Sequence, residues 1–229
     1  MVHGDPSGFF CAQSTCEPEH RAQGTYGILT RVTVVHTKAA HATLTEWQRR
    51  AADDRLELVA GELVPKAQPD FIHAQAQFGL AEELRPVFHR RGGGANPGGW
   101  WIAGEVDLVL GEDGFRPDLV GWRRERVPTM PQERPVAVRP DWVCEVLSQS
   151  NASHDTIVKM WRYHAAHIPH YWILDPVTQT LAVYRDSADG YVNVLMADAG
   201  QTVRAEPFAA LELRVGLLFG VDRDDPAPR

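Results

Sequence analysis

Residues 140–148, PDWVCEVLS, contain an apolar run that predicts a buried strand and yet carries a carboxylate within it. A charged side chain is costly to bury unless it is paired or binds a metal ion. Glu145 therefore marks a candidate site on a central strand. The alternative left open is a solvent-facing position on a one-sided strand, since Val143 shares the face of Glu145 while Cys144 and Val146 take the other.

On both sides of this strand, hydrophobic periodicity predicts an α/β domain with a mixed central sheet flanked by helices. Three prolines make residues 127–139 an irregular excursion, and Pro86 is expected to kink the helix that contains it. The predicted elements are helices over 45–54, 70–91 and 153–166, hairpins over 56–64 and 181–196, and strands over 100–110, 116–122, 142–147 and 171–174.

Local signals place some of these elements more closely. Thr45 is the expected start of the first helix, and Ala60-Gly61 is the expected turn of the first hairpin. The helix over 70–91 is expected to bury its apolar positions, which are Ile72, Ala76, Phe78, Leu80, Leu84 and Phe88.

Composition predicts one domain over residues 44–220. Residues 1–43 lack sustained periodicity and are expected to form a poorly ordered extension, and residues 221–229 a C-terminal tail. No apolar run approaches the roughly 18 residues that span a bilayer, and the first residues do not resemble a signal peptide. Three cysteines do not make a disulfide framework. We therefore expect a cytoplasmic protein with no membrane partner.

The formal charge of −7 argues against a general nucleic-acid coat protein, which needs many basic contacts to phosphate. It is compatible with an enzyme that has a local basic cleft and a carboxylate site. The basic residues comprise twenty Arg and only three Lys, at positions 38, 66 and 159. Such a bias suggests that lysine is kept only at positions where arginine could not take its role.

A second carboxylate, Asp118, stands at the start of the apolar strand Pro117–Val120. Carboxylates at strand ends can hold Mg²⁺, which prefers hard oxygen ligands. A nearby lysine can stabilise transition-state charge or orient a water molecule. The alternative is that Asp118 begins a strand with its side chain in solvent.

Five segments in order resemble the Uma-two (Uma2) family of restriction endonucleases, which belongs to the PD-(D/E)xK nuclease superfamily. The resemblance spans about residues 44–220 and implies a restriction-endonuclease-like fold. The segments are RLELVAGELV (55–64), RPDLV (116–120), PDWVCEVLS (140–148), the spaced Asp155, Lys159 and Tyr163, and HYWILDP (170–176).

The resemblance also implies roles for particular residues. Asp118 and Glu145 match the metal-binding acids of the superfamily. Leu147 stands where the superfamily lysine usually lies, and the resemblance points instead to Lys159 on the next helix. Glu62 matches an additional acidic residue that would complete the metal shell, and His73 matches a histidine on the following helix. The chain departs from the family pattern in having Ala60 and Gln149.

Plainer interpretations stay open for several of these residues. Ile157, Val158 and Trp161 belong to an apolar stripe nearly opposite Lys159, so Lys159 could lie on an exposed helix face. Glu62 follows a glycine turn, where exposed acids are common. His73 could be a packed or solvated histidine.

Other polar groups give weaker signals. A zinc site at His164, His167 and His170 is disfavoured because Pro169 breaks the helix, and one at Cys11, Cys16 and His20 is disfavoured by its spacing. The arginine clusters Arg90-Arg91 and Arg123-Arg124-Arg126 could contact phosphates, although such clusters are usually solvated.

The sequence thus predicts a metal-dependent endonuclease that hydrolyses phosphodiester bonds, with DNA a better candidate than RNA. Asp118, Glu145 and Glu62 are the expected ligands of Mg²⁺, for which Mn²⁺ could substitute, and Lys159 is the expected catalytic cation. A homodimer would supply the two sites that duplex cleavage needs. The alternative is a non-catalytic nucleic-acid-binding or regulatory protein that retains the fold.

Overall fold

The computed structural model describes residues 41–92, 97–148 and 152–225, and these described residues form one compact unit. The predicted extension lies outside these ranges except for residues 41–43. Cys11, Cys16 and His20 of the disfavoured zinc site, and Gln149, also lie outside them. Every helix among the described residues is too short or too polar to span a lipid bilayer.

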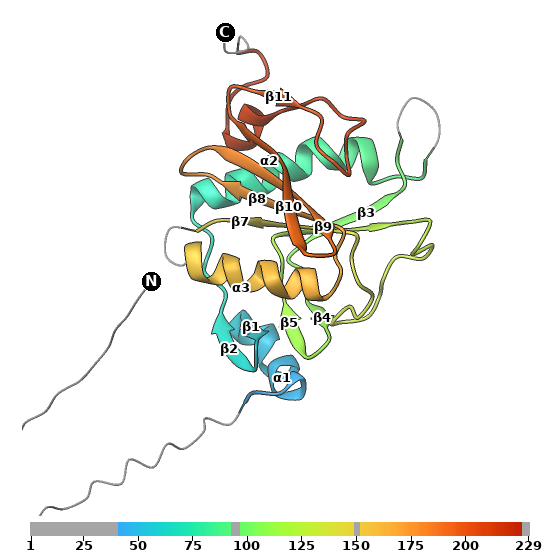
Figure 1. Cartoon of the computed structure of the whole chain (residues 1–229), viewed down its shortest axis with the longest axis vertical. Coiled ribbons are helices and arrows are strands. Elements are labelled where there is room, and N and C mark those ends of the chain that lie inside the picture. The colour runs from blue at the N-terminus through green and yellow to red at the C-terminus, as the bar shows by residue number, and fades with distance from the viewer. Residues whose placement is uncertain (1–40, 93–96, 149–151, 226–229) are drawn as a thin grey trace, which may run out of the picture. The chain divides into compact units, whose positions relative to one another are not determined.

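A six-stranded mixed sheet forms the centre of the molecule and confirms the α/β prediction (Figure 1). One neighbouring pair, β7 and β8, is parallel, and the other four pairs are antiparallel. In spatial order the strands are β10 (Gly190–Asp198), β9 (Thr180–Ser187), β8 (His170–Asp175), β7 (Trp142–Val146), β6 (Leu119–Arg123) and β3 (Trp100–Gly104).

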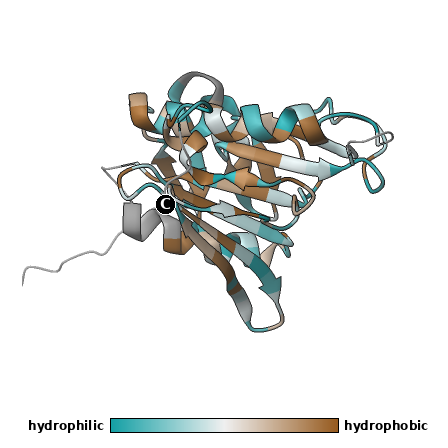
Figure 2. Ribbon diagram, turned by 90° about the horizontal axis from the view of Figure 1, so that it is seen from above, coloured by the Kyte–Doolittle hydropathy of each residue, from teal (hydrophilic) through white to brown (hydrophobic). Residues whose placement is uncertain are grey.

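Two helices cover opposite faces of this sheet, α2 (Phe71–Phe88) and α3 (Ala152–Ala165) (Figure 1). All five residues of β7 are buried, which fits a strand covered on both faces. Figure 2 shows hydrophobic colouring along much of the sheet. The fold therefore places Glu145 in the interior, and the solvent-facing alternative is wrong.

The predicted buried face of α2 needs a correction. Ala76, Leu80, Leu84 and Phe88 are buried, but Ile72 and Phe78 are 39% and 73% exposed. Phe78 is two residues from both Ala76 and Leu80, and two residues correspond to about 200° around a helix. It therefore points away from the face that contacts the sheet.

A smaller sheet holds the first hairpin, β1 (Leu56–Val59) and β2 (Glu62–Pro65), beside β5 (Asp113–Phe115) and β4 (Leu108–Leu110). The hairpin turn at Ala60-Gly61 is confirmed, and both residues have positive φ as a type I′ turn requires. Helix α1 (Leu44–Asp54) packs on β1, with Trp47 almost fully buried. This helix begins earlier than predicted, because Thr43 and not Thr45 caps it.

The single strand predicted over 100–110 is wrong. Glu105 has a positive φ, and the chain leaves the main sheet after β3 to enter the smaller sheet as β4. The short elements β11 (Thr202–Val203), β12 (Leu213–Arg214) and the 3-10 helix η1 (Val215–Phe219) were not predicted. Part of η1 packs against α2, where the backbone of Leu218 approaches Gly79 closely.

Candidate active site

Asp118 and Glu145 come together because β6 and β7 are hydrogen-bonded neighbours. Asp118 immediately precedes β6, and Leu119 pairs with Cys144 of β7. Asp118 Oδ2 accepts a hydrogen bond of 2.7 Å from the backbone N–H of Val146. The two carboxylates are 1% and 6% exposed, so both lie inside the protein, and Asp118 is not in solvent.

Lys159 reaches the same place from α3. Its Nζ lies 2.7 Å from Glu57 Oε2 and 3.4 Å from Glu145 Oε1, and the residue is 5% exposed. Ile157 and Trp161, from the predicted apolar stripe, are 57% and 60% exposed. Helix α3 therefore turns the face of Lys159 inward, the reverse of what its apolar pattern suggests.

A third acid, Glu57, completes the cluster in place of Glu62. Glu57 lies in β1, is 1% exposed, and also accepts a hydrogen bond of 2.8 Å from the backbone N–H of Arg116. Glu62 is exposed beside the hairpin turn, and the hydrogen bonds and ion pairs found among the described residues do not connect it to this cluster. Glu57 shows the same signal as Glu145, a carboxylate within an apolar run.

Two cationic or polar side chains surround Asp118. Lys66 Nζ lies 2.7 Å from Asp118 Oδ1 and 3.7 Å from Glu105 Oε1. His73 Nε2 lies 3.3 Å from Asp118 Oδ1, so His73 faces the cluster from α2. Burial alone would raise the pKa of Asp118, but Lys66 and His73 hold that pKa well below its usual range. Asp118 is therefore a carboxylate at neutral pH.

The pKa of Glu145 is shifted in the opposite direction, upwards. Burial, reinforced by Asp118 and Glu57 and only partly offset by the lysines, raises the pKa of Glu145 to about 7. The hydroxyl group of Tyr163, which is fully buried one helical turn after Lys159, donates a hydrogen bond of 2.6 Å to Glu145 Oε1. This bond fixes the orientation of the carboxyl group.

The charge pattern bears on whether a metal ion fits. Three carboxylates, from Glu57, Asp118 and Glu145, are interleaved with the ammonium groups of Lys66 and Lys159. Within the described ranges no three His, Cys, Asp or Glu side chains form a ready set of ligands. The Lys66 ammonium group beside Asp118 marks a position that already accepts a cation. Hard carboxylate oxygens at that position are the donors that Mg²⁺ prefers, provided that Lys66 moves aside.

Two of the three histidines of the disfavoured zinc site, His164 and His167, lie beside Asp186. His164 Nδ1 and His167 Nδ1 lie 2.6 Å and 3.7 Å from the two carboxylate oxygens of Asp186. They do not form a group of three ligands with a further His, Cys, Asp or Glu in the described part of the chain.

The raised pKa of Glu145 predicts a pH dependence of stability. Between its ordinary pKa of 4.5 and about pH 7, the folded protein binds more protons at this position than the unfolded chain. The free energy of unfolding should therefore fall as the pH rises through this interval. Thermal unfolding in EDTA, compared between the native protein and Glu145→Gln, measures the contribution. Parallel curves for the two proteins would contradict it.

A mixed sheet with acids on two neighbouring strands and a lysine from the adjoining helix defines a restriction-endonuclease-like nuclease fold. The Uma2 family model, described as "Putative restriction endonuclease", matches residues 42–216, and the chain belongs to this family. A crystal structure of a "putative nuclease" from Anabaena variabilis has the same fold, with a TM-score of 0.64 and 21% identity over 77% of this chain and 97% of that one. The chain matches no curated protein. Membership in the family supports nuclease activity.

Proposed function

We propose that this protein is a divalent-metal-dependent endonuclease that hydrolyses phosphodiester bonds of DNA. The observation that supports this most strongly is the meeting of Asp118, Glu145 and Lys159 inside the protein, from two strands and a helix. Burying three carboxylates and two ammonium groups together is costly, and a fold that needed only stability would be served better by apolar residues. Such a cluster is a candidate functional site.

Asp118 and Glu145 are the residues that would hold Mg²⁺ or Mn²⁺. The bound cation would supply Lewis-acid neutralisation of phosphate charge and a water molecule of lowered pKa. Asp118 is already ionised at neutral pH because of Lys66 and His73, whereas Glu145 has to release a proton first. Tyr163 keeps Glu145 Oε1 in place by donating a hydrogen bond to it from its hydroxyl group.

Lys159 is the residue that would face the negative charge developing on the phosphate. Glu57 accepts from Lys159 Nζ at 2.7 Å and so holds the ammonium group beside Glu145. A positioned ammonium group in a water-poor site stabilises such charge far better than one in solvent. Glu57 is thereby a positioning residue, because it acts through Lys159.

A homodimer is part of the proposal, since cutting both strands of a duplex needs two sites related by two-fold symmetry. The rival function is a regulatory or nucleic-acid-binding protein that has the fold and no activity. The net charge of −7 favours that rival, because a net negative charge does not favour tight binding to DNA phosphates. Metal binding at Asp118 and Glu145 is the discriminating property.

The experiment is a cleavage assay with the purified protein in Mg²⁺, Mn²⁺ or EDTA. Supercoiled DNA, single-stranded RNA and a small phosphodiester are the parallel substrates. We expect DNA to be cut in either metal and not in EDTA. Cleavage of RNA alone would reassign the substrate. Absence of cleavage, together with absence of Mn²⁺ binding by calorimetry, would favour the regulatory rival.

A further inference from the structure

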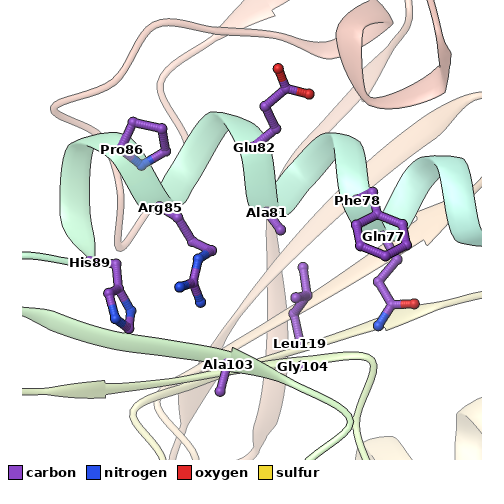
Figure 3. Close-up of a pocket in the computed structure, with 10 residues that line it drawn as sticks. All are labelled: Gln77, Phe78, Ala81, Glu82, Arg85, Pro86, His89, Ala103, Gly104 and Leu119. Carbon is purple, nitrogen blue, oxygen red and sulfur yellow. The ribbon is translucent and has the colours of Figure 1, made fainter.

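A trough of about 690 Å³ lies between α2 and β3, as drawn in Figure 3. We call it the α2–β3 trough. It is within the size range of small-molecule sites. The small side chain of Ala81 and the lack of one at Gly104 leave the space between helix and strand open.

One end of the trough adjoins the carboxylate cluster. Gln77, which lines the trough, donates a hydrogen bond of 2.8 Å to the backbone carbonyl of Asp118. Leu119, the next residue in the chain, also lines it. Gln77 is one helical turn after His73, whose Nε2 contacts the Asp118 carboxylate. A ligand in the trough would therefore begin beside the reacting residues.

The middle of the trough combines an aromatic surface with hydrogen-bonding groups. Phe78 is 73% exposed at its rim, and Figure 3 shows Gln77, Arg85 and His89 directed from α2 towards β3, whereas Glu82 points away. His89 Nδ1 accepts from the Ile102 N–H at 2.9 Å, so neutral His89 carries its proton on Nε2 as a donor. Arg85 Nη1 donates to the Ile102 carbonyl at 2.6 Å, which engages one of five guanidinium N–H groups.

Arg85 and His89 line the far end of the trough, and Arg124 lies just beyond it, in a chain whose net charge is −7. The guanidinium group of Arg124 stacks 3.4 Å from the ring centre of Trp101, and His89 lies against the edge of the same ring. Burial lowers the pKa of His89, and Arg85 and Arg124 lower that pKa further. Among the ion pairs of the described residues, none joins Arg85 or Arg124 to a carboxylate. Unpaired guanidinium groups gathered in this way suit phosphate.

We propose that the α2–β3 trough binds one unpaired nucleotide of the substrate strand next to the phosphate that is cut. Its base stacks on Phe78 and bonds to Gln77 or His89, and the following phosphates lie on Arg85 and Arg124. This inference rests on the proposed function and deepens it, because it makes the substrate a strand with an unpaired nucleotide. A paired base cannot enter a trough between a helix and a strand without leaving its duplex.

The test measures DNA binding in EDTA, where cleavage does not interfere. Phe78→Ala removes the stacking surface. Ala81→Leu fills the trough with a larger side chain, and leucine is well tolerated in helices. Phe71→Ala is the matched control, because Phe71 is 82% exposed on the same helix and does not line the trough. Fluorescence anisotropy with a short single-stranded oligonucleotide, its duplex and a mononucleotide gives the affinities, and thermal unfolding confirms that each variant folds.

We expect Phe78→Ala and Ala81→Leu to weaken single-strand binding by about tenfold or more, the range found when a base loses one aromatic partner, and Phe71→Ala to leave it unchanged. The proposal is overturned if Phe78→Ala and Phe71→Ala behave alike, if the duplex binds as tightly as the single strand, or if the mononucleotide binds as tightly as the oligonucleotide. If the trough variants bind normally and the native protein cuts DNA, the trough is not the nucleotide site, whereas the proposed nuclease function stands. If the native protein cuts nothing but the trough variants bind single strands more weakly, the trough is supported and the nuclease function is rejected.

Discussion

Replacing Glu145 by glutamine is expected to reduce metal-dependent DNA cleavage at least about a hundredfold. Glutamine has nearly the same shape, and its amide oxygen can still accept from the Tyr163 hydroxyl group, so the site keeps its packing. What the substitution removes is the ability of residue 145 to become a carboxylate next to Asp118 when a metal ion binds. The variant should fold at least as stably as the native protein, because a buried ionisable group becomes neutral.

The measurement is the initial rate of plasmid nicking in Mg²⁺ and in Mn²⁺, with Mn²⁺ affinity determined by calorimetry on the same samples. Glu62→Gln is the matched control, since Glu62 is an exposed carboxylate in the hairpin that also holds the buried Glu57. Glu62→Gln should cut as fast as the native protein. Equal rates for all three proteins would indicate a contaminating nuclease, and a slow Glu62→Gln would restore Glu62 as a ligand.

Replacing Lys159 by methionine should abolish cleavage and also destabilise the protein. The substitution keeps a long flexible side chain but leaves Glu57 and Glu145 without the ammonium group that lies 2.7 Å and 3.4 Å from them. Removing one partner of a buried ion pair costs about 3–5 kcal/mol. For a domain of this size, that corresponds to a decrease in Tm on the order of 10 °C.

A double variant separates stability from chemistry. Adding Glu57→Gln to Lys159→Met removes a carboxylate that would otherwise be unpaired, so the Tm should recover most of its loss. Cleavage should not recover, because the positioned ammonium group is still absent. A Lys159→Met protein with the native Tm would show that the ion pair is not formed. Recovered cleavage in the double variant would show that Lys159 acts only in folding.

The sequence was sufficient for the elements whose signals are local. The hairpin around Ala60-Gly61 and the buried strand around Glu145 depend on turn chemistry and on an uninterrupted apolar run, and both were predicted. The strand over 100–110 failed because the crossing between two sheets is set by tertiary pairing. Only the positive φ at Glu105, invisible in the sequence, marks the break.

The candidate site was predictable in part. Asp118, Glu145 and Lys159 converge as expected, but Lys159 was found through the resemblance and the scarcity of lysine, because the apolar pattern of its helix pointed the other way. An amphipathic helix usually turns its apolar face to the core, but a helix that buries a polar cluster turns polar residues inward. Glu57 was missed in favour of Glu62, although its place between Leu56 and Leu58 repeats the pattern that identified Glu145.

The hydrogen bonds that Arg85 and His89 make to Ile102 have a consequence for assembly. They occupy the outward N–H and C=O groups of β3, which is one edge of the main sheet. Exposed edges of this kind recruit strands from other molecules and lead to aggregation. Two copies of this chain therefore cannot associate by continuing the sheet past Ile102. The subunits of the proposed dimer would have to meet elsewhere, through helices, loops or another strand edge such as β10.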